Sequence, residues 1–154
     1  MDTTYSRARR LVRRDPLKRI NRHSVDGIAA ESPFRRIERV RAGLPASVLD
    51  ETAAILGIAK SVLIKAAGIP VSTAGAQKRS LKPLSPDHSE RILRVIRATR
   101  RAEEVFGDPQ EGRAWLIDGI PALGGHRPLD LLDTQDGYEL VIDELERIVF
   151  GAPA

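Results

Sequence analysis

Carboxylate side chains that could do acid–base or metal chemistry occur in two groups near the C-terminal end of the sequence. Asp130 and Asp133 lie three positions apart, and a second group follows further along the chain, Asp143, Glu144 and Glu146. A catalytic pair needs one carboxyl group inside a pocket, where burial raises its pKa. On the amphipathic helices expected here, these spacings predict an exposed acidic face. We therefore favour a solvated surface over a catalytic pair.

Other patterns that support catalysis or cofactor binding are absent from the sequence. There is no cysteine, and the three histidines (His23, His88 and His126) are too scattered for a metal site. No serine–histidine–aspartate arrangement stands out, and the glycine-rich phosphate loop ending in lysine is missing. We expect a binding protein rather than an enzyme, with neither metal nor cofactor.

Charge divides the chain into two halves of opposite sign. The 154 residues carry a net charge of +4, which is the balance of +13 in residues 1–102 and −9 in residues 103–154. A basic half favours nucleic acid as a partner, and an acidic half favours a protein surface. No apolar run approaches the roughly 20 residues of a membrane span, and none follows the basic N-terminus as a secretory signal would. The expected location is the cytoplasm, without membrane contact.

The first 31 residues are expected to form a mostly disordered arm. Repulsion between like charges and the small apolar surface both oppose ordering. Such an arm could contact the phosphates of nucleic acid or could be a solvated extension, and the sequence leaves both open. Its basic residues are Arg7, Arg9, Arg10, Arg13, Arg14, Lys18, Arg19 and Arg22.

Start and stop signals divide residues 32–106 into amphipathic helices. Ser32-Pro33 begins the first, in which Phe34, Ile37 and Val40 recur at helical spacing up to Gly43. The same signals predict further helices at residues 44–57, 60–67 and 85–106. The last of these is the longest, and we expect it to join the two halves of the chain.

The corner around Gly68 has the rhythm of a helix-turn-helix motif. Glycine can take the left-handed conformation there, a hydrophobic residue follows, and small polar residues begin the next helix. On this interpretation residues 71–79 form a recognition helix, in which Ser72, Thr73 and Gln77 contact bases while Lys78 and Arg79 contact phosphates. Ile64 and Ala74 are unusual for the motif, and Gly75 weakens the helix by about 1 kcal/mol. An ordinary helical corner is therefore the alternative.

Residues 107–154 are predicted to form a glycine-hinged module of short helices. Asp108-Pro109 begins one, Pro128 begins another, and Thr134 caps the last. Trp115 suits either the core or an interface. In the last helix Tyr138, Val141 and Leu145 are expected to pack within the chain. The apolar residues that follow helical spacing there are Tyr138, Val141, Ile142, Leu145, Ile148 and Val149.

Unusual residue types recur at fixed offsets in this module. They include Trp115-Leu116, Pro121 to Gly125, Pro128 to Thr134, Gly137, Val141, Leu145, Arg147-Ile148 and Gly151. In these residues the module resembles the toxin-binding domain of the Xre/MbcA/ParS antitoxins, and residues 44–106 resemble the helix-turn-helix half of the same family. The resemblance implies an all-α fold, with an N-terminal Xre-like helix-turn-helix unit (residues 32–106) and a small C-terminal helical toxin-binding domain (residues 107–154).

The function that the resemblance implies is that of an antitoxin. Its partner would be a RES-domain toxin, which degrades NAD, and the C-terminal end would mask the active site of that toxin. A homodimer that binds operator DNA and represses its own operon is implied as well. The alternative is a DNA-binding regulator whose C-terminal half dimerises or binds another protein. The implied toxin-binding residues are Trp115, Leu116, Pro121, Leu123, Gly124, Gly125, Pro128, Leu129, Arg147, Phe150, Gly151, Ala152, Pro153 and Ala154.

Overall fold

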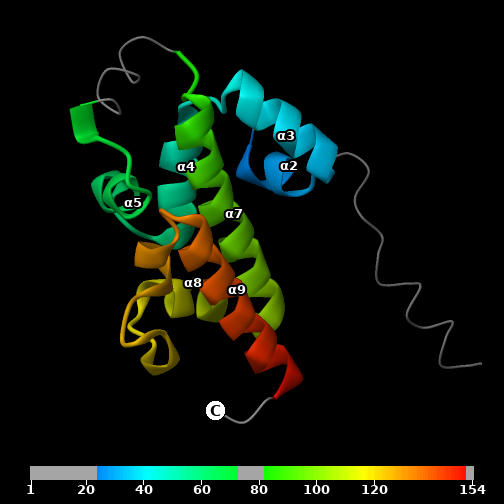
Figure 1. Cartoon of the computed structure of the whole chain (residues 1–154), viewed down its shortest axis with the longest axis vertical. Coiled ribbons are helices and arrows are strands. Elements are labelled where there is room, and N and C mark those ends of the chain that lie inside the picture. Colours follow the sequence, from blue (N-terminus) through cyan, green and yellow to red (C-terminus); the bar gives the residue numbers. More distant parts are fainter. Residues whose placement is uncertain (1–23, 73–81, 152–154) are drawn as a thin grey trace, which may run out of the picture.

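A computed structural model describes residues 24–72 and 82–151 and shows an all-helical fold (Figure 1). These residues form seven α-helices and two short 3-10 helices (η), and none of them lies in a strand. The expected all-α class is confirmed. In chain order the elements are α2 (Val25–Ala29), α3 (Pro33–Ala42), α4 (Ser47–Leu56), α5 (Lys60–Ala66), α7 (Pro86–Phe106), α8 (Pro109–Ile117), η1 (Pro121–Leu123), η2 (Pro128–Leu131) and α9 (Gln135–Phe150).

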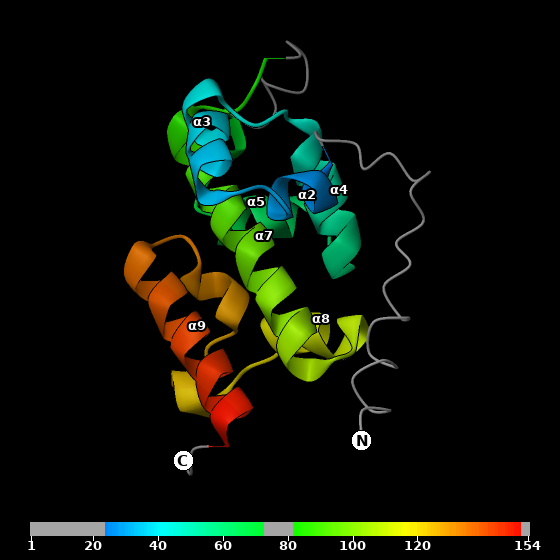
Figure 2. The same cartoon turned by 90° about the vertical axis from the view of Figure 1, so that its right-hand side faces the viewer.

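The longest helix, α7, is the element against which most others pack. Helices α2 and α3 contact it from the N-terminal half, and α8 and α9 contact it from the C-terminal half (Figure 2). Its inner face is fully buried at Ile92, Val95, Ile96, Ala98 and Ala102. One hydrophobic core therefore runs through both halves, and the boundary expected after residue 106 separates sequence patterns rather than two cores.

Local capping interactions account for the helix starts predicted from the sequence. The side chain of Ser32 accepts a hydrogen bond from the Arg35 amide, and that of Ser85 accepts one from His88. Asp108 likewise accepts a hydrogen bond of 2.7 Å from the Gln110 amide. A proline follows each of these caps and has the φ angle that a first helical turn needs. The predicted starts of α3, α7 and α8 are confirmed.

The expectation of disorder up to residue 31 is wrong for its last eight residues. Ser24 caps the short helix α2, whose Val25 and Ile28 are 2% and 0% exposed. These two side chains contribute to the core, and α2 packs on α4 and α7. Residues 24–31 contain no lysine or arginine, and their apolar side chains are ordered by burial against α4 and α7. Residues 1–23, which contain the arginines that motivated the expectation, lie outside the described residues.

Helix α3 departs from the amphipathic pattern expected of it. Phe34 is 81% exposed and Ile37 is 47% exposed, and only Val40 of the predicted stripe is half-buried against the core. The helix has no fully buried residue. The apolar spacing predicted the helix correctly but not the burial of its stripe.

The C-terminal half packs on α7 through a close backbone approach. Helix α8 crosses α7 at Gly112, where a Cβ atom would lie 2.6 Å from backbone atoms of Ala102 and Glu103. Beside this crossing, the half-buried carboxylate of Glu103 binds Arg100 and Arg113, and Arg100 also pairs with Asp26 of α2. This network ties α2, α7 and α8 together.

Within residues 24–72 and 82–151, no helix is both long and apolar enough to cross a membrane. The same residues contain no group of three or more acidic, histidine or cysteine side chains that is arranged to hold a metal ion.

Candidate functional site

The segment between α8 and α9 is a hydrogen-bonded surface loop with exposed glycines. The Gly125 amide donates to the Ile120 carbonyl (2.9 Å), and the Ile120 amide donates to the His126 carbonyl (3.1 Å). Gly124 and Gly125 have φ angles of +66° and +80°, a region that favours glycine. A Cβ atom on Gly119 would lie 2.9 Å from the Gly125 carbonyl oxygen. The glycines are therefore required by the shape of the loop itself.

Buried leucines hold this loop on the body of the protein. Leu116 and Leu129 are both 0% exposed, and Pro128 is also buried. Contact of these three side chains with a partner, as the sequence suggested, is not available in this structure because they pack inside the chain. Their burial instead fixes the positions of η1 and η2.

A buried arginine that sequence reasoning missed fixes the end of the loop. Arg94 is 8% exposed, and its guanidinium donates to the backbone carbonyls of Leu132 (3.1 Å) and Asp133 (2.8 Å). These carbonyls follow η2 and precede α9, so Arg94 joins α7 to the loop just before α9 begins. In the sequence Arg94 resembles the other arginines of α7, and nothing in the pattern indicated that it would be buried.

The remaining predicted toxin-binding residues differ in exposure. Trp115 is half-buried, and its ring lies 6.1 Å from that of Phe106, so it belongs partly to the core. Leu123 is also half-buried. Ala152, Pro153 and Ala154 lie outside the described residues. The exposed members of the set are Pro121, Gly124, Gly125, Arg147, Phe150 and Gly151.

The last turn of α9 presents three large apolar side chains to solvent. Ile148 is 40% exposed, Val149 is 48% exposed and Phe150 is 79% exposed. Ile148 and Val149 follow the same helical spacing as the buried Tyr138, Val141 and Leu145, but the structure leaves them exposed. Figure 1 shows this end of α9 at the lower edge of the molecule, beside the C-terminus. We call Ile148, Val149 and Phe150 the C-terminal apolar cluster.

The helix-turn-helix corner has the geometry expected of its glycine. Gly68 has a φ angle of +64°, and the Ile69 amide donates to the Ile64 carbonyl (3.0 Å) across the turn. Ile64 is unusual for the motif, but its side chain packs in the hydrophobic core and is only 5% exposed. Of the proposed DNA-contacting residues, Ser72 is helical and exposed. The other four, Thr73, Gln77, Lys78 and Arg79, lie outside the described residues.

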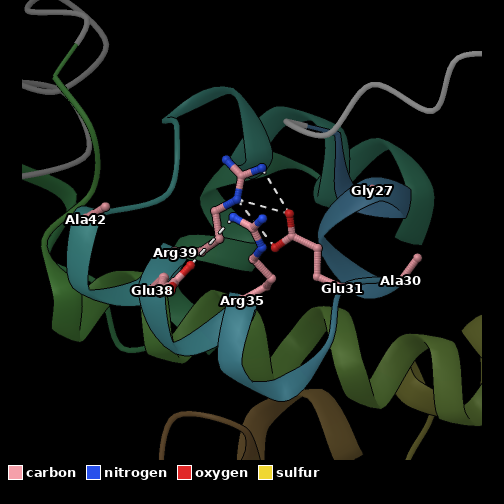
Figure 3. Close-up of a pocket in the computed structure, with 7 residues that line it drawn as sticks. All are labelled: Gly27, Ala30, Glu31, Arg35, Glu38, Arg39 and Ala42. Atoms are coloured by element: carbon pink, nitrogen blue, oxygen red, sulfur yellow. Dashed lines mark hydrogen bonds and ion pairs between the residues drawn. The ribbon is translucent and has the colours of Figure 1, made fainter.

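A separate hollow of about 500 Å³ lies between α2 and α3 (Figure 3). Its charged side chains neutralise one another, because Arg39 pairs with Glu31 (3.0 Å) and Arg35 pairs with Glu38 (3.7 Å). The two pairs thus compensate each other's charge within the hollow.

The fold defines a class of protein in which a helix-turn-helix unit shares one hydrophobic core with a small C-terminal helical module. Residues 35–97 match the antitoxin Xre-like helix-turn-helix domain, and residues 101–151 match the antitoxin Xre/MbcA/ParS C-terminal toxin-binding domain. The chain belongs to the Xre/MbcA/ParS family of antitoxins, which are binding proteins rather than enzymes.

Curated relatives support this assignment along most of the chain. The chain is 32% identical over 130 residues to a protein of Sphingobium sp. (strain YBL2) named Prs ADP-ribosylating antitoxin, covering 79% of this chain and 82% of that protein. It is 28% identical over 126 residues to the antitoxin Xre of Yersinia enterocolitica, covering 81% and 85% of the two chains. It is also 28% identical over 110 residues to the antitoxin Xre of Photorhabdus laumondii, covering 71% and 74%.

Proposed function

We propose that this antitoxin neutralises a RES-domain toxin by placing its C-terminal end in the NAD-binding cleft of that toxin. The observation that carries the proposal is the C-terminal apolar cluster, which is exposed on an otherwise charged helix. Apolar side chains exposed together at one end of a monomer are typical of a protein interface. The Sphingobium relative is named Prs ADP-ribosylating antitoxin. Because ADP-ribosylation consumes NAD, this name agrees with a partner that acts on NAD.

The proposed contact surface is narrower than the set implied by the sequence. It consists of the C-terminal apolar cluster with Arg147 and Gly151, together with the exposed loop residues Pro121, Gly124 and Gly125. The buried residues Leu116, Pro128 and Leu129 act by supporting this surface. Ala152, Pro153 and Ala154 continue from the cluster and are included because they follow it directly in the chain.

Co-expression with a RES-domain toxin tests this proposal. The full chain should co-purify with the toxin and preserve the NAD of the host cell. A chain that ends at Arg147 should keep its helical circular dichroism, because the residues removed after it in α9 are all partly or largely exposed. It should nevertheless lose both co-purification and protection of NAD. Full protection by the shortened chain would refute masking by the tail.

We further propose that the helix-turn-helix unit binds operator DNA and represses the operon that encodes this chain. Support comes from the Gly68 corner, the exposed Ser72 and the net charge of +13 in residues 1–102. Such proteins read DNA as dimers whose half-sites lie about one helical turn apart, so the proposal includes a homodimer. Because NAD and operator DNA are both cytoplasmic in bacteria, the proposed location is the cytoplasm.

Replacing Lys78 and Arg79 together by glutamine should weaken operator binding and reduce its dependence on salt. Each phosphate contact contributes about 0.9 to the slope of log K against log salt, so we expect the slope to fall by about 1.8. The measurement is a fluorescence-anisotropy titration of the operator at several salt concentrations.

The matched control replaces Arg35 and Arg41 by glutamine. It removes the same charge from α3, which lies on the other side of α7 from the helix-turn-helix corner (Figure 1). If both pairs of substitutions lower the slope equally, the effect is one of net charge, and the assignment of Lys78 and Arg79 to phosphate contacts fails.

A further inference from the structure

Four arginines converge on a hollow that neither proposed surface uses. The hollow has a volume of about 310 Å³ and lies where α2, α3, α7 and α9 meet. Its lining includes Arg36 of α3, Arg97, Arg100 and Arg101 of α7, and Tyr138 and Ile142 of α9. Figure 2 shows α3 and α9 on the same side of α7, one above the other.

Two of these arginines are neutralised by carboxylates and two are not. Arg100 pairs with Asp26 and Glu103, and Arg101 pairs with Glu104 and Glu146. Among the described residues, Arg36 has a hydrogen bond to the Glu31 carbonyl, and Arg97 lies over the ring of Tyr138, 5.1 Å from its centre. Neither has an ion-pair partner in the described part of the chain, so both guanidinium groups can pair with the charge of a ligand.

Beside these two guanidinium groups, Tyr138 provides a neutral hydrogen-bond donor. Burial raises the pKa of its phenol above the ordinary value. The positive charges of Arg97 and Arg36 lower this pKa in part, and the negative charge of Glu90 raises it. The phenol is therefore protonated at neutral pH. Glu104 lines the hollow, and its carboxylate and that of Glu146 are paired with Arg101. Asp26 and Glu103 are likewise paired with Arg100, so the carboxylate among these neighbours that opposes an anion without such a pair is Glu90, which acts on Tyr138 through its charge.

The hollow also has apolar walls. Ile142, Ala29 and the face of the Tyr138 ring line it beside the guanidinium groups. Its volume lies at the lower end of the range of small-molecule sites, which is about 300–1,000 Å³. A site of this kind accommodates more than an inorganic ion.

We propose that this hollow binds the phosphate group of a small phosphorylated organic molecule, with Arg36 and Arg97 as its charged ligands. Guanidinium groups form paired, charge-assisted hydrogen bonds with phosphate oxygens, and two unpaired guanidiniums match a dianion. The apolar walls contact the organic part. A free molecule is favoured over the DNA backbone because α2 and α3, which contribute Ala29 and Arg36 to the hollow, lie on the other side of α7 from α5, the helix before the helix-turn-helix corner (Figure 1).

Nuclear magnetic resonance of the full chain tests the site directly. The probes are inorganic phosphate, adenosine monophosphate, adenosine without phosphate, and a short DNA duplex of random sequence. Both phosphate probes should produce saturable shifts of the Nε–Hε resonances of Arg36 and Arg97, and adenosine should produce none. The double variant Arg36→Gln/Arg97→Gln should bind both phosphate probes at least about tenfold more weakly.

The control is again the variant Arg35→Gln/Arg41→Gln, which should change the affinity by less than about twofold. If the double variant at the hollow does not fold, the single substitution Arg97→Gln carries the test, because Arg97 is exposed. The proposal is overturned if neither phosphate probe gives a saturable shift, or if both pairs of substitutions weaken binding equally. It is also overturned if only the duplex shifts these resonances, which would assign the hollow to a nucleic-acid backbone.

Discussion

The substitution Gly137→Ala should destabilise the chain by at least about 3 kcal/mol, although alanine is the better helix former. Gly137 lies in the first turn of α9, and a Cβ atom there would overlap the carbonyl oxygen of Leu131. That oxygen belongs to η2, which is held by the buried Leu129 and therefore cannot move freely. Urea unfolding followed by circular dichroism measures the change in free energy of unfolding.

Intrinsic helix propensity makes the opposite prediction for this substitution. Because Gly137 has an ordinary helical φ angle, propensity alone gives a stabilisation of about 1 kcal/mol. The control is Glu139→Ala, at an exposed position one residue beyond Tyr138, which should change stability by no more than about 0.5 kcal/mol. A variant Gly137→Ala as stable as the parent would show that η2 and α9 do not approach each other closely.

The substitution Phe150→Ala should reduce affinity for the proposed RES-domain toxin by about 30-fold or more, the size expected of an aromatic hot spot. Phe150 is 79% exposed, so the free chain loses little packing when the ring is removed. Stability should accordingly stay unchanged while toxin binding falls. Biolayer interferometry measures the affinity, and recovery of NAD in cells that express the toxin measures the consequence.

Leu140 provides the matched control for Phe150. It is another exposed apolar residue of α9, at 53% exposure, but it lies about two turns before the C-terminal apolar cluster. Leu140→Ala should alter toxin affinity by less than about threefold. Equal losses from the two substitutions would indicate that the whole outer face of α9 binds the toxin, and an effect at Leu140 alone would refute binding through the helix end.

The continuous core limits which experiments can separate the two proposed activities, toxin binding and DNA binding. Leu116, Leu129, Val141 and Leu145 of the toxin-binding half are fully buried in the same cluster as the inner face of α7. Removing everything after Gly107 would expose this face of α7 and disturb the helix-turn-helix unit as well. Substitutions in the last turn of α9 avoid this problem because they leave the core intact.

Local sequence signals were enough to predict the helical class and most helix boundaries. A capping side chain at Ser32, Ser85 or Asp108 satisfies amides two or three residues away, and the proline after it fixes the local backbone. Gly107 ends α7 in the left-handed conformation for an equally local reason. Such signals are contained within one turn of the chain, and they do not depend on where other helices lie.

Which apolar and charged residues face solvent depends instead on how the helices pack together. Phe34 and Ile148 follow helical spacing as well as any core residue, but the neighbouring helices do not cover them. Conversely, Arg94 resembles the other arginines of α7 in the sequence and is buried, because two backbone carbonyls from residues 132 and 133 satisfy its guanidinium. Burial depends on contacts between residues far apart in the sequence, and helical periodicity gives the face of a helix without giving the partner that covers it.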